Sequence, residues 1–244
     1  MKIQTFFKGL TWLVLLNLVI KPVWIFGIDR ELQNTVGHEA YGSYFALLNL
    51  SIVLSFIADA GLTNMMNRRL AAGEALHMPQ LIRLKLLLSL IYISVVALFG
   101  VVSGISLWNI LILVTVIQLL NSFLVFFRNM ITARQLFKTD AWISVIDKLI
   151  MIVVFGSYFY LPVFAGSVDL VNFLSFQLLI TFIVTIIAWL VAFKGYHIPS
   201  KPLKASAILT GALPFTAIIF FMSLHTRLDG FLLERIHFNG ALEA

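Results

Sequence analysis

The sequence predicts an all-α polytopic membrane protein with seven transmembrane helices. Hydrophobic residues make up 61% of the 244 residues and charged residues only 11%, against roughly half and a quarter in ordinary soluble domains. Residues 86–127 contain no charged residue, and as one helix they would be about 63 Å long, roughly twice the hydrocarbon core of a bilayer. A chain with so few charges cannot cover a soluble surface, and this run must fold back once.

The seven helices follow from one criterion, about 20 largely apolar residues per span. Ser103, Gly104 and Ser106 predict the turn that divides the uncharged run. The apolar runs are continuous, whereas a transmembrane β-barrel would show alternating segments of about ten residues. The predicted spans are 8–28, 41–66, 84–103, 107–129, 141–164, 170–193 and 205–228.

Lysine and arginine are concentrated in alternate connections, which predicts the orientation of the chain. Cytoplasmic loops are enriched in these cations, so the N-terminus is expected in the cytoplasm. The net charge of +6 is then largely explained by topology, and scattered loop cations without a basic stripe do not indicate a nucleic-acid partner. The cations of these connections are Lys2, Lys8, Arg68, Arg69, Arg83, Lys85, Arg128, Arg134, Lys138, Lys194, Lys201 and Lys204.

The chain has no cysteine, which excludes a disulfide framework, a thiol metal site and a catalytic thiol. No cofactor or metal site is expected. Lys21 and Pro22 interrupt the first apolar run and no small-x-small cleavage motif follows it, which argues against a cleaved signal peptide.

Polar residues recur on single faces of several spans. Ser51, Ser55 and Asp59 repeat at four residues, so they form one stripe on an otherwise apolar helix. Such a stripe faces protein or water, and helix-to-helix hydrogen bonding and a wet interior are both open interpretations. Similar sets are Thr115, Gln118 and Ser122; Gln177, Thr181 and Thr185; and Asn17 with Lys21.

Charged residues inside spans are the strongest functional signal, because a charge at mid-bilayer costs at least about 2.5 kcal/mol. Lys21 lies about 20 Å along its helix from Lys8, and Pro22 should bend the helix there. A role in a pathway and a structural ion pair or bend are both possible for Lys21. Lys148 can extend toward the surface, and it need not pair with Asp147 because neighbouring residues point about 100° apart.

Asp59 allows two interpretations. It is either a carboxylate at a helix end within reach of water and headgroups, or part of an inner gate that pairs with a cation of a neighbouring cytoplasmic loop. Pairing with Arg68 is not expected, because nine residues along one helix separate the two by about 13 Å.

Several short motifs give the chain a family resemblance. They are a lysine in the first span, YGSY at residues 41–44, DAGL at residues 59–62 followed by basic residues, and RLDGFLLERIHFNGA at residues 227–241. With these motifs the chain resembles polysaccharide flippases of the O-antigen and lipid-linked oligosaccharide exporter family. That family belongs to the superfamily of multidrug and toxin extrusion transporters.

The resemblance implies a fold of twelve to fourteen helices in two six-helix lobes. Residues 1–204 are then the N-terminal lobe, and residues 205–244 are the first helix of the second lobe. On this basis we expect the chain to be a fragment of a longer protein.

The resemblance also implies alternating access as the mechanism, without an enzymatic step. The substrate would be a polyprenyl-pyrophosphate-linked oligosaccharide, bound in a cavity by Lys21, Arg30, Lys148, Arg227 and Asp229, with Asp59 at the gate. Membrane lipids and the polysaccharide polymerase machinery are the implied partners. The implied location is the bacterial cytoplasmic membrane.

Two alternatives are weighed against the flippase. A multidrug exporter of the same superfamily would have an acid-lined cavity for cationic drugs, whereas cations exceed acids within these spans. A polytopic acyltransferase or glycosyltransferase would need an acid/base or metal cluster. His225 and Asp229 come closest, but their spacing is one residue short of HxxxxD and no DxD motif exists.

Overall fold

The computed structural model describes residues 3–160, 168–194, 196 and 204–240, with side chains for residues 11–12, 14–160, 168–194, 196 and 204–225. Its regular structure in this part of the chain is entirely helical. Six stretches are long and apolar enough to cross a membrane, as expected for a multi-pass membrane protein. They are His38–Asp59, Met78–Val102, Trp108–Ala133, Phe137–Tyr160, Leu170–Phe193 and Ala205–His225.

These six stretches correspond to the second through seventh predicted spans. The first predicted span, 8–28, falls on α1 (Ile3–Val23) and the π-helical turn η1 (Trp24–Asp29). It is not among the six candidates in the described residues. The all-helical membrane fold is therefore confirmed, and the count of seven spans stays a prediction.

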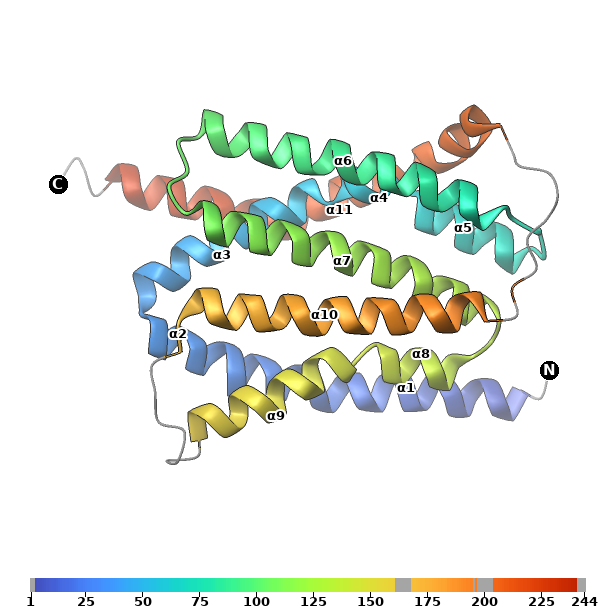
Figure 1. The fold of residues 1–244 in the computed structure, drawn as a ribbon, viewed down its shortest axis with the longest axis horizontal. Helices are drawn as coiled ribbons and strands as arrows, with labels where there is room; N and C mark the ends of the chain where they lie inside the picture. Colours follow the sequence, from blue (N-terminus) through green and yellow to red (C-terminus); the bar gives the residue numbers. More distant parts are fainter. Residues whose placement is uncertain (1–2, 161–167, 195, 197–203, 241–244) are drawn as a thin grey trace. The chain divides into compact units, whose positions relative to one another are not determined.

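The predicted turn in the uncharged run is confirmed. Helix α6 (Met78–Val102) ends one residue before Ser103, and α7 (Trp108–Ala133) begins after Ser106. Gly104 has a φ of 65°, a backbone conformation that glycine adopts without steric cost. Figure 1 shows the two helices antiparallel on either side of this turn.

The chain divides into two compact units. Unit 1 comprises Met1–Tyr41 and Phe123–Tyr196, and unit 2 comprises Gly42–Ser122 and His197–Ala244. The expected division into residues 1–204 and 205–244 stays a prediction.

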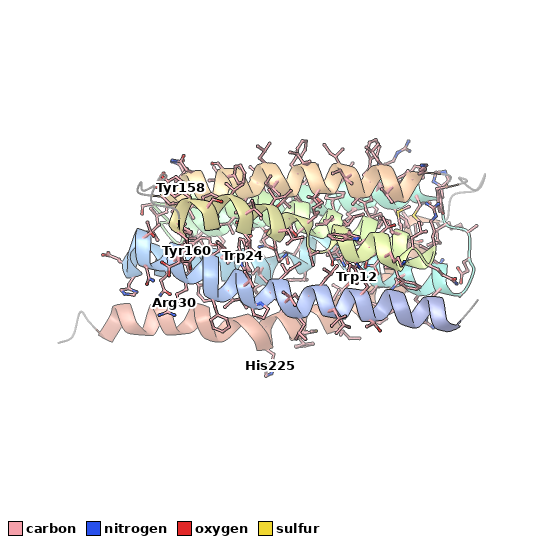
Figure 2. The ribbon with its side chains drawn as sticks, turned by 90° about the horizontal axis from the view of Figure 1, so that it is seen from below. Trp12, Trp24, Arg30, Tyr158, Tyr160 and His225 are labelled. Carbon is pink, nitrogen blue, oxygen red and sulfur yellow. The ribbon has the colours of Figure 1, made fainter. Side chains whose placement is uncertain are left out.

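In unit 1, α1 packs along α8 (Phe137–Ile143) and α9 (Ile146–Tyr160), and α10 (Leu170–Phe193) packs on α9. Figure 1 shows α1, α8 and α9 running in the same direction. Aromatic rings fill these contacts, with the Phe155 and Phe173 centroids 4.7 Å apart. Figure 2 shows Tyr158 and Tyr160 toward one end of the unit and Trp12 toward the other, the positions that aromatic residues favour at membrane interfaces.

Two arginines of unit 1 that the sequence analysis placed among the loop cations bind helix ends. Arg128 on α7 makes a bidentate ion pair with the buried Asp140 on α8, at 2.7 and 3.2 Å. Arg134 Nη1 donates to the carbonyl oxygens of Val191 and Ala192 in the last turn of α10. Cations are favourable at a helix C-terminus because its carbonyl groups carry partial negative charge.

Two predicted spans are interrupted, contrary to the prediction of continuous helices. The span 41–66 is built from α3 (His38–Leu54), α4 (Phe56–Asp59) and the start of α5 (Leu62–Ala71). Its main break lies at Ala60 and Gly61, whose φ values of 42° and 70° are left-handed and cannot continue an α-helix. The span 141–164 is divided into α8 and α9.

In unit 2, α4 packs on α6, and α11 (Ala205–Gly240) packs on α4 and α5. The Phe56 and Phe220 rings meet edge to face, with centroids 4.8 Å apart. At Gly61 the two backbones come so close that an added Cβ would lie 2.7 Å from Thr216 N and 2.8 Å from Phe215 Cβ. Glycine is therefore required at this position for both its φ and its size.

Candidate functional site

A buried ion pair lies at the centre of unit 2. The ammonium of Lys85 on α6 is 2.6 Å from Asp59 Oδ1 at the end of α4, and 2.8 Å from Ser122 Oγ on α7. The Lys85 side chain has no exposed surface, and that of Asp59 is 15% exposed. The pair therefore joins three helices away from solvent.

Local backbone geometry places the carboxylate of Asp59. The chain reverses into left-handed conformations at Ala60 and Gly61, and α5 begins at Leu62. Asp59 then accepts hydrogen bonds from the backbone N–H of Thr63, at 3.2 Å, and from the Thr63 hydroxyl. These bonds satisfy a free N–H of the first turn of α5, where partial positive charge favours an anion.

Further polar contacts lie on the buried face of α6 that contains Lys85. Ser89 donates to the carbonyl of Lys85 at 2.7 Å. One turn further, Tyr92 is fully buried, its hydroxyl lies 2.5 Å from Ser51 Oγ, and it also hydrogen bonds the Thr115 side chain. Lys85, Ser89 and Tyr92 follow the i, i+4, i+7 spacing of one helix face.

The two polar stripes predicted on the second and fourth spans therefore meet across α6. Ser51 and Asp59 come from the first stripe, and Thr115 and Ser122 from the second. At these residues the stripes make hydrogen bonds and ion pairs between helices, as the first of the two interpretations of the sequence holds. Ser55 departs from this pattern, because its hydroxyl donates to the carbonyl of Ile52 in its own helix.

Lys85 was not among the predicted site residues, because its position in the sequence fits that of a cytoplasmic loop cation. In the structure it lies seven residues into α6, about 10 Å from the start of that helix. The cation that pairs with Asp59 thus comes from the neighbouring helix, not from a loop. The signal that could have found it is the shared face of Lys85, Ser89 and Tyr92.

A second charged group lies where α8 and α9 meet in unit 1. Lys148 Nζ is 3.1 Å from Asp147 Oδ2, so these neighbours do pair, although their spacing did not require it. The other carboxylate oxygen, Asp147 Oδ1, is buried without a hydrogen-bond partner in the described part of the chain. Burying a carboxylate oxygen without a hydrogen bond costs free energy, so we expect a further hydrogen-bond donor to bind Asp147 Oδ1.

The predicted cavity residue Lys21 lies at the same level as Lys148. Asn17 Nδ2 donates to Ser144 Oγ at 3.4 Å, which fixes the register of α1 against the junction of α8 and α9. Lys21 follows Asn17 by four residues, and Lys148 follows Ser144 by four residues. Helices α1, α8 and α9 run in the same direction (Figure 1). Lys21 is thus about one turn beyond the bond on α1, and Lys148 is in the first turn of α9, just beyond the break between α8 and α9.

Lys21 is exposed and makes no ion pair with any residue whose side chain the structure describes. Just beyond it, after Pro22, α1 changes to the π-helical turn η1. Proline removes a backbone donor and disturbs the helix ladder, and π-turns are frequent at functional sites.

The remaining predicted site residues are Arg30, Arg227 and Asp229. Arg30 begins α2 (Arg30–Val36) and is exposed, and Figure 2 shows it toward the same end of unit 1 as Tyr160. Arg227 and Asp229 belong to α11, but their side chains are outside the described residues. Figure 2 shows His225 projecting outward from α11.

Unit 2 thus holds a buried ion pair with hydroxyl groups around it, and unit 1 holds the paired Lys148 and the exposed Lys21. No group of three or more His, Asp or Glu side chains suited to a metal ion occurs among the described residues. Comparisons with protein-family models, curated proteins and solved structures found no match. The roles assigned to Lys21, Arg30, Asp59, Lys148, Arg227 and Asp229 stay predictions.

Proposed function

We propose that this protein is a membrane transporter that moves a polyprenyl-pyrophosphate-linked oligosaccharide across the bacterial cytoplasmic membrane by alternating access. The observation that carries this proposal is the position of Lys21 and Lys148 at one level of unit 1, beside two helix irregularities. Charged residues inside spans and discontinuous helices are typical of transport pathways.

The charge of Lys21 favours an anionic substrate, since Lys148 is already paired with Asp147. A diphosphate in a low-dielectric site is attracted to a cation several times more strongly than in water. Lys21 is exposed and has no ion pair with a described residue, so its charge is available to a ligand. The lipid-linked oligosaccharide itself rests on the family resemblance of the sequence motifs.

The test is transport in proteoliposomes containing the purified protein. We expect a polyprenyl-pyrophosphate-linked oligosaccharide to be flipped, measured as its accessibility to a membrane-impermeant lectin, and a cationic dye not to be moved. Transport of the dye alone would favour the multidrug exporter. Cleavage or transfer of the sugar would show an enzyme instead.

Substitutions of Lys21 test directly whether the charge of this lysine is needed for transport. Lys21→Ala should abolish flipping while membrane levels stay nearly unchanged, and Lys21→Arg should keep part of the activity because the charge remains and its geometry changes. Lys138→Ala is the matched control, since Lys138 is an exposed lysine on α8. Normal flipping by Lys21→Ala would make the lysine structural.

The proposed orientation has a cytoplasmic N-terminus. Reporter fusions after Lys138 and after Lys201 should then be active in the cytoplasm, and a fusion after Ser167 should be active outside. The opposite pattern would reject this orientation. The polysaccharide polymerase machinery is a proposed partner of this protein, and its co-purification with the protein would support that proposal.

A further inference from the structure

A basic cavity lies between α5 and α11 in unit 2, apart from the charged clusters described above. Its volume is about 340 Å³, at the lower end of the roughly 300–1,000 Å³ of ligand pockets. Its wall combines charged and apolar side chains, among them Arg68, Arg69, Glu74, Met65 and Phe215, together with Gly211.

The charges of the cavity favour an anion. Two arginines face one glutamate, which gives a net charge of 2 − 1 = +1. Arg69 and Glu74 are 3.8 Å apart, longer than a hydrogen bond, and Arg68 has no ion pair with a described residue. A guanidinium carries five N–H donors that match the oxygens of a phosphate, so both arginines retain donors for a ligand.

The shape of the cavity depends on two glycines. The close approach at Gly61 holds the start of α5 against α11, and the cavity is lined by residues from the later part of α5, among them Arg68 and Arg69. Gly211 leaves its floor open, since a Cβ there would lie 3.6 Å from both Arg69 Nη2 and Met65 Cγ. A larger side chain at Gly211 would occupy the space that a ligand needs.

The position of the cavity indicates the source of the anion. Arg68 and Arg69 lie beyond the candidate span that ends at Asp59, whereas Gly211 and Phe215 lie about 9 and 15 Å into the candidate span that begins at Ala205. The cavity therefore joins charged groups outside the spans to apolar groups inside one, as a headgroup site with an adjoining acyl chain requires. Met65 and Phe215 line the apolar part of the wall. Basic pockets between membrane helices are a known type of lipid headgroup site.

We propose that this cavity binds the phosphate headgroup of an anionic phospholipid, with Arg68 and Arg69 as its ligands. The lipid is a bound structural or regulatory partner, distinct from any transported substrate. The proposal therefore does not depend on the transport function.

The test is lipid binding by the whole protein in detergent, measured by native mass spectrometry during titration with phosphatidylglycerol. We expect one high-affinity adduct, and we expect Arg68→Gln/Arg69→Gln to weaken it by about tenfold or more, because charge-assisted hydrogen bonds are lost. Arg83→Gln is the matched control, since Arg83 is exposed on α6 and does not line the cavity. Equal loss in the control would overturn the proposal.

Two further variants test the cavity without removing an arginine. Gly211→Leu should reduce binding by filling the space, and Glu74→Gln should strengthen it by removing the competing carboxylate. Binding that is unchanged in both variants would overturn the proposal even if the arginine variants fold poorly.

Two probes distinguish the source of the phosphate. Phosphatidylcholine, whose headgroup carries no net charge, should not form the adduct. Glycerol phosphate should compete only at far higher concentration than phosphatidylglycerol. Equal competition by glycerol phosphate would mean a soluble phosphate ligand and would overturn the assignment to a lipid.

Discussion

Lys85 and Asp59 form an ion pair of 2.6 Å in which the lysine is completely buried. Taking two charges out of water costs several kcal/mol per ion, and their attraction repays this only when further hydrogen bonds satisfy both groups. Ser122 and Thr63 supply such bonds. The pair therefore specifies how α4, α6 and α7 meet, and each partner depends on the other.

Removing both partners should destabilise the protein clearly less than the sum of the two single removals. We expect Lys85→Met or Asp59→Asn alone to lower the free energy of unfolding by about 3–5 kcal/mol, because an uncompensated polar or charged group is left buried. The double variant should cost clearly less than the sum of the two. Unfolding in detergent, analysed as a double-mutant cycle, measures the coupling, and strict additivity would contradict it. Arg83→Met, an exposed cation on the same helix, should change little.

The close packing at Gly61 predicts a difference between two glycine substitutions. Gly61 and Gly73 both have positive φ values, 70° and 81°, but only Gly61 has neighbours near an added Cβ. Gly73→Ala should therefore show the backbone cost alone, about 1–2 kcal/mol. Gly61→Ala should show this cost plus the clash with α11, and so a larger drop in the thermal midpoint. Equal drops would mean that the contact with α11 contributes nothing.

Much of the architecture was predictable because membrane spans are set by composition and length. The turn at residues 103–106 followed from small polar residues within an apolar run that was too long for one bilayer. The stripes that contain Ser51 and Thr115 followed from helical spacing, since a polar face must meet protein or water. These features depend only on local sequence.

The partner of Asp59 was not predictable in the same way. Lys85 and Arg83, two residues earlier and exposed, both fit the distribution of cytoplasmic cations, and only the polar face that Lys85 shares with Ser89 and Tyr92 sets it apart. The break at Ala60 was hidden because alanine is a strong helix former. Its left-handed conformation reflects tertiary packing around Gly61. Pairing between helices depends on register, which local patterns do not determine.

Asp29 predicts a pH-dependent stability in unit 1. It lies at the end of η1, outside the six candidate spans, where burial raises the pKa of its carboxyl and a hydrogen bond with Tyr41 partly offsets this. The folded state then binds a proton more tightly than the unfolded state. The contribution of Asp29 to stability is therefore greatest below its ordinary pKa of 3.8 and is lost as pH rises through the raised value.

We accordingly expect Asp29→Asn to raise the thermal midpoint at pH 7, with the difference from the parent protein shrinking toward pH 4. The measurement is thermal unfolding in detergent between pH 4 and pH 8. Glu39→Gln, which removes an exposed carboxylate, should show no comparable trend. A parallel pH profile for Asp29→Asn and the parent protein would refute the prediction.

Asp59 is expected to act as a gate as well as a structural partner. Without its carboxylate, the buried ammonium of Lys85 has no counter-ion, and opening the helices to water relieves that cost. Asp59→Asn should therefore favour an arrangement in which the face of Ser51 and Ser55 is hydrated, and it should slow export. Only about 1.4 kcal/mol is needed to change such an equilibrium tenfold.

Cysteine labelling measures this opening, because the chain has no native cysteine. A cysteine at the half-buried Ser55 should react faster with a membrane-impermeant maleimide from the cytoplasmic side in Asp59→Asn than in the parent protein, at temperatures well below unfolding. Adding Lys85→Met should restore slow labelling, because no buried charge then remains to be hydrated. A cysteine at the exposed Ser106, in the turn after α6, should react equally in all variants when the reagent reaches that side. Unchanged labelling at Ser55 in Asp59→Asn would mean that Asp59 is only a structural partner of Lys85. Fast labelling that persists when Lys85→Met is added would mean that lost packing, not the unpaired charge, opens the helices.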